Sequence, residues 1–301
     1  MRVARVPDEL DGQVCSTGYV VLRPGPKLNA SFLFYSMFRS EFMEEVGRLQ
    51  KGASYPAVTD RQVLQQTIPL PTLEEQQRIV AILDQAFAAL DRAHVNAEAN
   101  VDDAELLFGS TLRASLSMHV DWPMKFLPEI SENLDRQRIP ITRKDREPGS
   151  VPYYGASGVV DYVADHIFDE DLLLVSEDGA NLLARTYPIA FSISGKSWVN
   201  NHAHVLRFND PTSQEYVRLY LNSISLEPYV SGMAQPKLNQ SSLNKIPIPL
   251  PDEDERAAIV AKAADMRQQC ETLAQRYSEQ LDDIATLRQS LLQQAFSGQL
   301  T

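Results

Sequence analysis

The sequence predicts an α/β protein in which globular parts, built of mixed short strands and helices, are separated by two long helices that form an antiparallel coiled coil. Three observations support this fold class. The chain repeats itself once, two segments of the repeat carry the apolar spacing of long helices, and the region between them alternates short β-rich runs with Gly- and Asn-bearing loops. With 301 residues and 44% apolar content, the chain can bury two ordinary cores.

The internal repeat places Gly52 on Gly232, and the register then holds without a gap to the end of the chain. The Ile-Pro-Leu-Pro run at 68–71 falls on the same four residues at 248–251. Such a unit is a whole domain plus a helix, far longer than a solenoid repeat. A duplicated module of this kind suggests that something is read twice, at two places held a fixed distance apart.

The first long helix is expected over residues 72–120 and the second over 251–301. Each begins next to a proline, and the second opens with four acidic residues that place negative charge at the positive end of the helix dipole. Apolar residues then recur in steps of four and three, a heptad pattern that requires a partner helix. If only one such segment were present, it would be interpreted as an ordinary long helix packed on a globular core. Two copies in one register favour an intramolecular antiparallel pair, which would be a rigid spacer.

The residues expected to form the seam between these helices share the heptad spacing. They are Ile79, Leu83, Leu90 and Leu107 in the first helix, and Ile259, Met266, Leu273, Tyr277, Ile284, Leu287 and Leu291 in the second. Each helix would be roughly 65 Å long at about 1.5 Å per residue.

The rest of the chain divides into residues 1–71 and residues 121–250. In the second of these regions, the runs at 171–175 and 188–193 predict strands. A helix is expected around 214–225, and its apolar face contains Tyr216, Leu219, Tyr220 and Ile224. Short helices are expected after two N-cap residues, Asn239 and Thr59.

The net charge of −12 is concentrated in the two long helices. Residues 72–117 carry eight acidic and three basic side chains, and residues 252–301 carry nine and five, so the globular parts are nearly balanced. This distribution removes the objection to a nucleic-acid partner, although no basic stripe marks a phosphate-binding face. The two cysteines, Cys15 and Cys270, indicate no disulfide framework, and no signal peptide or membrane span is predicted. We therefore expect a cytoplasmic protein without a membrane partner.

Five short motifs, taken together, are the most specific feature of the sequence. They are Ile-Pro-Leu-Pro at 68–71 followed by Glu74, Glu75, Gln76 and Ile79; Tyr-Tyr-Gly-Ala-Ser-Gly at 153–158; Glu-Asp-Gly-Ala-Asn at 177–181; Gly195 and Lys196 with Trp-Val-Asn-Asn-His-Ala-His at 198–204; and Ala-Phe-Ser-Gly at 295–298. In this combination the chain resembles, over essentially its whole length, the specificity subunit of a type I DNA restriction–modification system. The resemblance implies two target recognition domains, each reading half of a bipartite DNA site.

The resemblance also implies partners. The long helices would dock two modification subunits, which hold S-adenosylmethionine and methylate adenine, and a separate restriction subunit would supply the motor and the nuclease. Double-stranded DNA, the modification subunits and, through the complex, the restriction subunit are thus the expected partners. No cofactor is expected on this chain, and the specificity subunit itself catalyses nothing.

The chain departs from the family's pattern at its start. The repeat would place a counterpart of residues 121–203 ahead of the first copy, so residues 1–71 resemble only the later part of a first target recognition domain. Residues 121–250 resemble a whole second one. The resemblance therefore implies an N-terminal truncation within the first domain, and its completion by self-association or by a complementing half subunit is left open.

Reading a DNA sequence requires side chains that donate and accept hydrogen bonds in the major groove, together with groups that contact phosphates. The candidates are Tyr153, Tyr154 and Ser157 in one expected loop, and Lys196, Trp198, Asn200, Asn201 and His202 in another. Arg185 and Lys237 are the candidates for phosphate contacts. For each of them a structural role is the alternative, because Tyr and Trp often anchor loops and Asn often shapes turns. A basic stretch at 136–146 is interrupted by acidic residues, which favours a solvated loop over a phosphate contact.

An enzymatic function has little support in the sequence. His202 and His204 would face the same side of a strand, as two metal ligands must, but no third ligand has a diagnostic spacing. Phosphate-binding loops and nucleophile motifs are absent from the sequence. Two non-enzymatic hypotheses remain: a DNA-recognition subunit, which is favoured, and an assembly protein that has lost its DNA specificity.

Overall fold

The computed structural model describes residues 3–50, 57–117, 121–232 and 234–299. Its contacts divide the chain into two compact units. The first unit consists of Met1–Asp103 and Leu273–Thr301, and the second unit of Ala104–Thr272. Each of the two long helices contributes one part to each unit.

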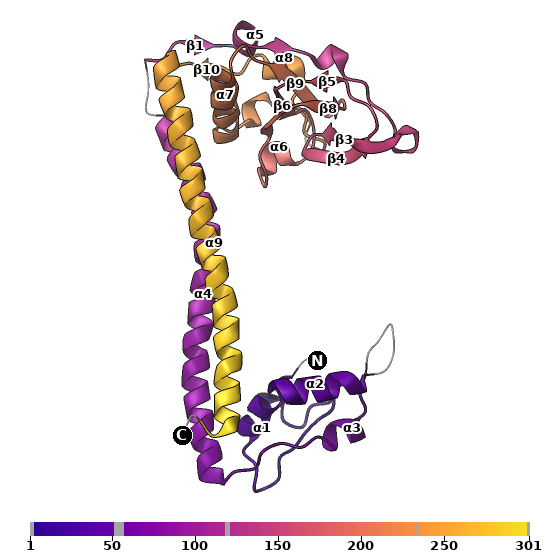
Figure 1. Cartoon of the computed structure of the whole chain (residues 1–301), viewed down its shortest axis with the longest axis vertical. Helices are drawn as coiled ribbons and strands as arrows, with labels where there is room; N and C mark the ends of the chain where they lie inside the picture. Colours follow the sequence, from indigo (N-terminus) through magenta and orange to yellow (C-terminus); the bar gives the residue numbers. More distant parts are fainter. Residues whose placement is uncertain (1–2, 51–56, 118–120, 233, 300–301) are drawn as a thin grey trace. The chain divides into compact units, whose positions relative to one another are not determined.

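The long helices are α4 (Leu73–Ser117) and α9 (Glu253–Ser297) (Figure 1). Both begin as the sequence predicts. The Asp252 carboxylate accepts a hydrogen bond from the backbone N–H of Glu255 at 2.9 Å, and three acidic residues occupy the first turn of α9. These groups satisfy and complement the free N–H groups at the positive end of the helix.

In the first unit, α4 and α9 pack side by side and antiparallel. Ile79 and Leu83 of α4 lie in one buried cluster with Leu292 and Ala295 of α9. The predicted seam residues Leu90 and Leu291 pack against the same cluster. Helix α1 (Ala30–Ser36) completes it with two buried aromatic side chains, Phe32 and Tyr35.

In the second unit, the other ends of the two helices pair in the same sense. Phe108, Leu112 and Leu116 of α4 share a buried cluster with Ala263 and Cys270 of α9. The predicted seam residues Ile259 and Met266 pack against that cluster. The predicted antiparallel coiled coil, and with it the predicted fold class, is confirmed.

Two of the predicted seam residues are wrong. Leu107 is 52% exposed and its counterpart in the repeat, Leu287, is 48% exposed. The buried positions of this part of the repeat are Ala104 and the predicted Ile284. One turn later, the seam contains Phe108 in α4. In α4 the buried residue therefore lies one position after the predicted Leu107, whereas the predicted Ile284 and Leu291 of α9 keep their places.

The counterpart of Phe108 in α9 is Arg288, whose guanidinium lies 4.8 Å from the ring centre of Phe87. A cation thus covers an aromatic ring at this position of the seam, an interaction that is attractive for Arg. Two other predicted seam residues, Leu273 and Tyr277, are half-buried.

The remaining elements of the first unit are short helices. They are η1 (Asp8–Leu10), α1, α2 (Ser40–Leu49) and α3 (Asp60–Leu64). Helix α3 has the predicted cap: the Thr59 side chain accepts from the Gln62 N–H, and the Gln62 side chain accepts in return from the Thr59 N–H. The predicted N-cap is confirmed, as part of a capping box with Gln62.

The described residues of the second unit form three small sheets. The elements are β1 (Met124–Lys125), α5 (Leu127–Ile130), β2 (Glu132–Asn133), η2 (Asp135–Gln137), η3 (Arg143–Asp145), β3 (Pro148–Gly155), β4 (Gly158–Val163), β5 (Phe168–Asp169), β6 (Leu172–Ser176), α6 (Asn181–Ala184), β7 (Ala190–Ile193), β8 (Lys196–Val199), β9 (Ala203–Arg207), α7 (Pro211–Ser223), η4 (Glu227–Tyr229), α8 (Gln240–Leu243) and β10 (Ile248–Pro249). One sheet has the order β2-β9-β6-β7 and is antiparallel, and a second has the order β4-β3-β8-β5. Strands β3 and β8 pair in parallel, and β1 pairs with β10.

All five residues of strand β6 are buried, because both faces of this strand are covered by other elements. Leu173 and Val175 face the cluster that contains α7 and the helix ends, whereas Leu172 and Leu174 face a second cluster with Val199 of β8. The side chains of a strand alternate between the two faces of its sheet. The β2-β9-β6-β7 sheet is therefore a middle layer between helices on one side and the second sheet on the other.

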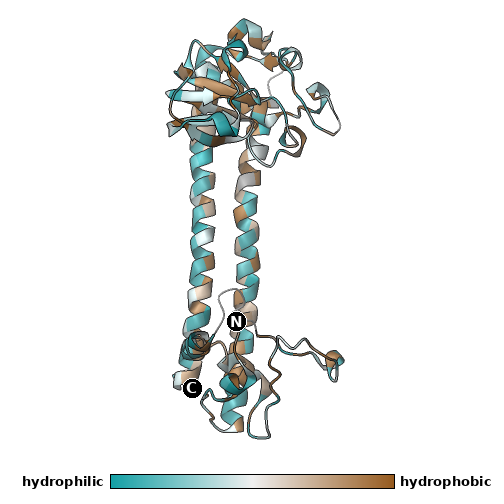
Figure 2. Cartoon of the chain, turned by 90° about the vertical axis from the view of Figure 1, so that its right-hand side faces the viewer, coloured by the Kyte–Doolittle hydropathy of each residue, from teal (hydrophilic) through white to brown (hydrophobic). Residues whose placement is uncertain are grey.

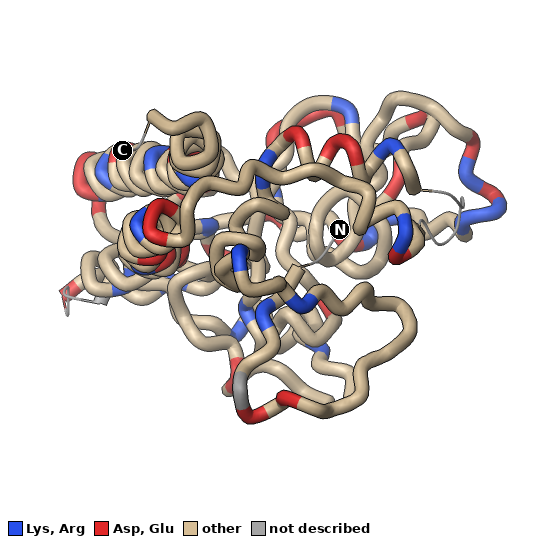
Figure 3. The backbone as a smooth tube through the Cα atoms, turned by 90° about the horizontal axis from the view of Figure 1, so that it is seen from below, with Lys and Arg blue, Asp and Glu red and all other residues tan. Residues whose placement is uncertain are grey.

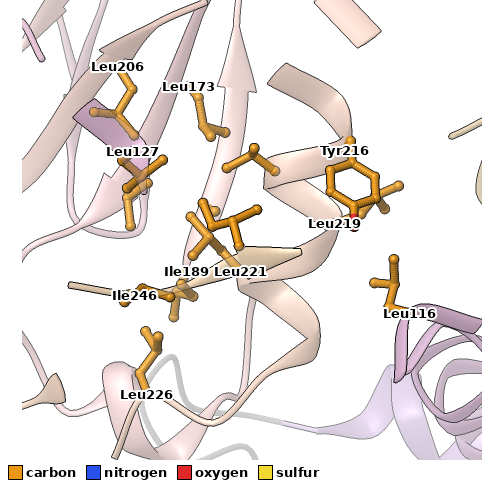
Figure 4. Close-up of a cluster of buried hydrophobic side chains, with 14 of the residues drawn as sticks. Leu116, Leu127, Leu173, Ile189, Leu206, Tyr216, Leu219, Leu221, Leu226 and Ile246 are labelled. Carbon is orange, nitrogen blue, oxygen red and sulfur yellow. The ribbon is translucent and has the colours of Figure 1, made fainter. Parts of the chain in front are cut away.

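Helix α7 confirms the predicted helical face. Tyr216 and Leu219 are buried in the cluster drawn in Figure 4, and Tyr220 and Ile224 pack against its edge. The Asn239 side chain accepts from the Ser242 N–H at 3.0 Å, so the N-cap predicted for α8 is also confirmed. Figure 2 shows hydrophobic residues among these strands, and hydrophobic and hydrophilic residues in alternation along α4 and α9. None of the described helices is both long and apolar enough to cross a membrane.

Candidate nucleic-acid interface

Four segments of the second unit, far apart in sequence, meet at one place. They are the β3–β4 turn at 155–158, residues 177–180 after β6, the β8–β9 turn at 200–202, and residues 236–238. Backbone hydrogen bonds join them: Glu177 N–H to His202 O at 2.9 Å, Leu238 N–H to Glu177 O at 2.8 Å, and Asn200 N–H to Tyr154 O at 3.0 Å. The Ser176 hydroxyl donates to the Ala156 carbonyl. We call these four segments the loop cluster.

The local sequence explains the shape of the loop cluster. Gly179 has a φ of +109°, a left-handed conformation that side chains disfavour, and its N–H donates to Pro236 O at 3.0 Å. In the β8–β9 turn, the Asn200 side chain accepts from the His202 N–H at 2.8 Å, which is an Asx turn. These bonds hold the segments without using the exposed side chains.

Four of the predicted DNA-contact residues are exposed on the loop cluster. They are Ser157 at the tip of the β3–β4 turn, Asn201 and His202 in the β8–β9 turn, and Lys237. His202 is paired, since its Nδ1 lies 2.8 Å from Asp178 Oδ2. Asp178 was not among the predicted contacts, although its place in the Glu-Asp-Gly motif was a signal. Together these groups offer hydroxyl, amide, imidazole and ammonium hydrogen-bonding atoms to an incoming ligand.

Two of the predicted contacts are wrong because their side chains are buried. Tyr153 is 1% exposed, and its hydroxyl is hydrogen-bonded to the backbone of Ile141. Asn200 is 7% exposed and serves the turn described above. Sequence reasoning assigned both to recognition loops, whereas the Tyr-Tyr-Gly motif lies in strand β3.

Two further candidates have a structural role, which was the alternative for each of them. Trp198 is half-buried, and its indole N–H donates to Ile139 O at 2.7 Å. Tyr154 is half-buried beside Phe191, with 6.1 Å between the ring centres, and burial raises the pKa of its hydroxyl. Trp198 thus anchors the loop that contains Ile139, whereas the Tyr154 ring in β3 packs beside Phe191 of β7.

Arg185, which the sequence predicted to contact phosphate, is half-buried and bonded within the domain. Its guanidinium donates to the carbonyl oxygens of Leu221 and Ile224 at the end of α7. Burial lowers its pKa, and the charge of Arg113 lowers it further. Arg185 thus serves as a cap for the C-terminal carbonyl groups of a helix. Its own backbone has a positive φ of 56°, which ends α6.

Lys196 lies apart from the loop cluster. It begins β8, where it is opposite Asp169 of β5, while the turn with Asn201 follows the other end of that strand. At about 3.3 Å per residue, the strand separates the two ends by more than about 10 Å. Lys196 is exposed, but it does not share a surface turn with Asn201 as the sequence suggested.

The basic stretch forms a loop anchored at several points. Residues 139–146 are named here the basic loop. It is held by the Trp198 and Tyr153 bonds to its backbone and by the Arg146 pair with Asp161 at 2.8 Å. Arg143 and Lys144 are exposed at its surface and have no ion pair with another described residue. Figure 3 shows that Lys and Arg positions are interspersed with Asp and Glu positions rather than gathered in one stripe.

His202 and His204 do not converge on one site. His202 lies in the turn, whereas His204 is 1% exposed inside β9 and bonds Asp135 at 2.6 Å. Asp135, Glu177 and His204 do offer three atoms within 4.8 Å of one another. Each carboxylate, however, already pairs with a cation, and the second ring nitrogen of His204 bonds Leu238 O at 2.7 Å. These groups therefore satisfy one another rather than forming an open coordination set.

The pKa values of the two carboxyl groups reflect this pairing. Burial raises the pKa of Asp135, but the hydrogen bond and charge of His204 outweigh it and hold the pKa below its ordinary value. Burial likewise raises the pKa of Glu177, and the hydrogen bond from Arg138 with the charges around it lowers the pKa overall. Both carboxylates are thus stabilised in their ionised form.

Comparisons with known proteins agree with this structure. The family model described as "Type I restriction modification DNA specificity domain" matches residues 6–100 and 119–281 of the chain. A curated protein of Haemophilus influenzae, named as a type I restriction enzyme specificity subunit (S.HindORF215P), is 33% identical over 141 residues. These residues are 47% of this chain and 36% of that relative, so the match spans little more than a third of the relative's length.

Two solved structures are similar over 98% of this chain. One belongs to work on the "structural basis underlying complex assembly and conformational transition of the type I R-M system"; the match covers 78% of that chain, with 25% identity and a TM-score of 0.80. The other is the crystal structure of the HsdS subunit from Thermoanaerobacter tengcongensis, of which 77% is covered, with 26% identity and a TM-score of 0.62.

Proposed function

The chain belongs to the type I restriction–modification DNA specificity family, and from this membership we propose that its second unit reads one half of a bipartite target in double-stranded DNA. The loop cluster would contact base edges, and the basic loop would contact the phosphate backbone. The long helices would dock the modification subunits. The chain is a non-catalytic specificity subunit, so S-adenosylmethionine would be held by those partners.

The observation that carries this proposal is the loop cluster itself. Asn201, His202 and Ser157 are exposed there on turns whose backbone is fixed by hydrogen bonds to other segments. Amide and hydroxyl side chains are among those that hydrogen-bond to base edges in the major groove, and an imidazole ring can also donate and accept there. Turns fixed in this way support reading, because a contact that is already positioned costs less conformational entropy on binding.

The basic loop supports the phosphate part of the proposal. Arg143 and Lys144 extend from a backbone held by Trp198 and Tyr153, and neither forms an ion pair with a described residue, while the charge of Arg143 also lowers the pKa of Asp161. Such cations supply the sequence-independent part of DNA affinity. This assignment differs from the solvated loop favoured by the sequence, because the anchors fix the position of the charges.

The helix pair supports the docking part. Apart from the seam, α4 and α9 expose long polar surfaces to which other chains can bind. The exposed leucines Leu106, Leu107 and Leu287 interrupt these surfaces. We propose that the modification subunits bind there and that the restriction subunit joins through the assembled complex.

Selection of DNA by the assembled complex tests this function. The full chain would be co-purified with its modification subunits, assembly would be followed by mass photometry, and bound duplexes would be selected from a random library. We expect enrichment of a sequence with a defined half-site. A stable complex that enriches no sequence would instead support a scaffold without DNA specificity.

A matched pair of histidines locates the reading surface. His202→Ala, in the loop cluster, is expected to change or relax the enriched sequence. His166→Ala removes another solvent-accessible His–Asp pair, with Asp165, at a different place in the second unit and should leave the enriched sequence unchanged. The same enrichment in both variants would exclude His202 from reading.

A further inference from the structure

A buried ionic network lies directly beneath the loop cluster. At its centre is His204, which is 1% exposed. One ring nitrogen lies 2.6 Å from Asp135 Oδ2 and the other 2.7 Å from the carbonyl oxygen of Leu238. Both partners are oxygen acceptors, so a ring with a proton on each nitrogen satisfies both of them. The other oxygen of Asp135 accepts from the Val205 N–H at 2.8 Å.

The second half of the network surrounds Glu177. Arg138 donates to Glu177 at 2.8 Å and to the carbonyl oxygen of Ala203 at 2.6 Å. Lys237 lies 3.1 Å from the other oxygen of Glu177. The side chains of Arg138 and Glu177 are each only 12% exposed, so removing one partner would leave the other charge buried and unpaired.

The network joins the segments that carry the exposed groups. Asp135 and Arg138 lie directly before the basic loop, and Glu177 directly precedes Asp178, the partner of His202. His204 follows the β8–β9 turn by two residues, and Leu238 ends the last segment of the loop cluster. A shift of His204 would therefore displace several DNA-facing segments at once.

We propose that Asp135, Arg138, Glu177 and His204 are positioning residues for DNA reading, which fix the loop cluster and the basic loop in register with each other without touching DNA themselves. This inference rests on the proposed function of the second unit. The lowered pKa values of Asp135 and Glu177 are consistent with it, because they show that the network stabilises both carboxylates in their ionised form. The network is buried and each of its members makes several bonds. Residues of this kind hold the contact residues of a precise binding site in position.

The test separates positioning from general stability. The full chain in complex with its modification subunits would be titrated with the selected duplex and with an unrelated duplex, and the ratio of the two dissociation constants gives the discrimination. His204→Ala is the central variant. Arg138→Lys keeps the charge but cannot bridge Glu177 and Ala203 O in the same way, and it serves if His204→Ala does not fold.

We expect both variants to lower the discrimination by about tenfold, the size of the preference for one base pair, while the affinity for the unrelated duplex changes by less than about threefold. His166→Ala should leave both constants unchanged. If the residues had only a structural role, both affinities would fall in proportion to the folded fraction and their ratio would stay as in the wild type. A wild-type ratio of the two dissociation constants in either variant would therefore overturn the proposal. A wild-type complex without any discrimination would instead refute the proposed function, and the positioning role with it.

Discussion

Two neighbouring asparagines, Asn200 and Asn201, have different roles in the β8–β9 turn. Asn200 is 7% exposed and its amide oxygen shapes the turn, whereas the neighbouring Asn201 is exposed and has no role in the described hydrogen bonds of that turn. The stretch Trp-Val-Asn-Asn-His does not distinguish them by residue type. Only the direction of each side chain, set by the end of strand β8, separates a structural amide from one available to DNA.

This difference predicts unequal effects on stability. Asn200→Ala removes a buried hydrogen-bond acceptor and should lower the free energy of unfolding by about 1–3 kcal/mol. Asn201→Ala changes an exposed side chain and should alter it by less than about 0.5 kcal/mol. Urea unfolding followed by circular dichroism checks both values. Equal destabilisation by the two variants would contradict the assignment.

The carboxyl groups of the buried network predict a loss of stability in acid. The pKa values of Asp135 and Glu177 lie below their ordinary values of 3.8 and 4.5 in the folded state. The unfolded chain therefore binds more protons in this range, so the contribution to stability is present above these values and is lost as the pH falls below them. Urea unfolding of the wild type between about pH 3 and pH 7, a range that includes the ordinary carboxyl pKa values, measures it.

A matched pair of variants isolates this effect. Asp135→Asn should flatten the dependence of unfolding free energy on pH, because residue 135 no longer titrates. Asp165→Asn removes an acid whose side chain is 82% exposed and should retain the wild-type dependence. An unchanged slope in Asp135→Asn would show that the pairing with His204 does not shift this titration.

At the scale of elements, burial in the seam between α4 and α9 determines how much each leucine contributes to stability. Leu112 is 4% exposed and lies in the buried cluster of the second unit, whereas Leu107 of the same helix is 52% exposed. Leu112→Ala should cost about 2–5 kcal/mol of stability, and Leu107→Ala less than about 0.5 kcal/mol. Thermal unfolding of the two variants compares them directly. A cost for Leu107→Ala equal to that for Leu112→Ala would restore the original seam prediction.

Much of the element layout could be predicted from the sequence, because its signals are local. Helix starts follow from Thr59 and Asn239 as N-caps and from the acidic turn before α9, and the long helices follow from their apolar spacing. The exposed leucines show the limit of this reasoning. The apolar spacing does not show that Phe108, rather than the neighbouring Leu107, is the buried residue of that turn.

The candidate site could be predicted only in part, for a physical reason. The Tyr-Tyr-Gly motif was expected to be a loop, but it belongs to β3, which pairs in parallel with β8 across a long stretch of sequence. Non-local pairing of this kind leaves no local pattern. In the same way, Asp135 meets His204 only through the fold, so no spacing in the sequence reveals the buried network.

At the scale of the whole molecule, the net charge of −12 coexists with exposed cations on the basic loop. The double variant Arg143→Gln, Lys144→Gln should reduce the slope of log K against log salt by about 0.9 for each phosphate that the loop no longer neutralises. Lys262→Gln, an exposed change on α9, should leave the slope unaltered. Fluorescence anisotropy of the assembled complex over a salt series measures these slopes. An unaltered slope in the double variant would exclude the basic loop from binding phosphate.

The central claim is that the loop cluster of the second unit specifies part of a DNA target, and mapping of methylated adenines tests it most directly. The wild-type chain, Asn201→Ala and Asn209→Ala would each be co-expressed with the modification subunits, and methylation would be mapped across the host DNA. Asn209 is an exposed asparagine beyond the opposite end of β9 and serves as the matched control.

We predict one motif for the wild type and for Asn209→Ala, and a motif changed or relaxed in a single contiguous half for Asn201→Ala. A complex of the wild-type chain that forms but methylates no defined motif would contradict the account. So would a motif that Asn201→Ala, and further substitution of Ser157 and His202, leave unchanged.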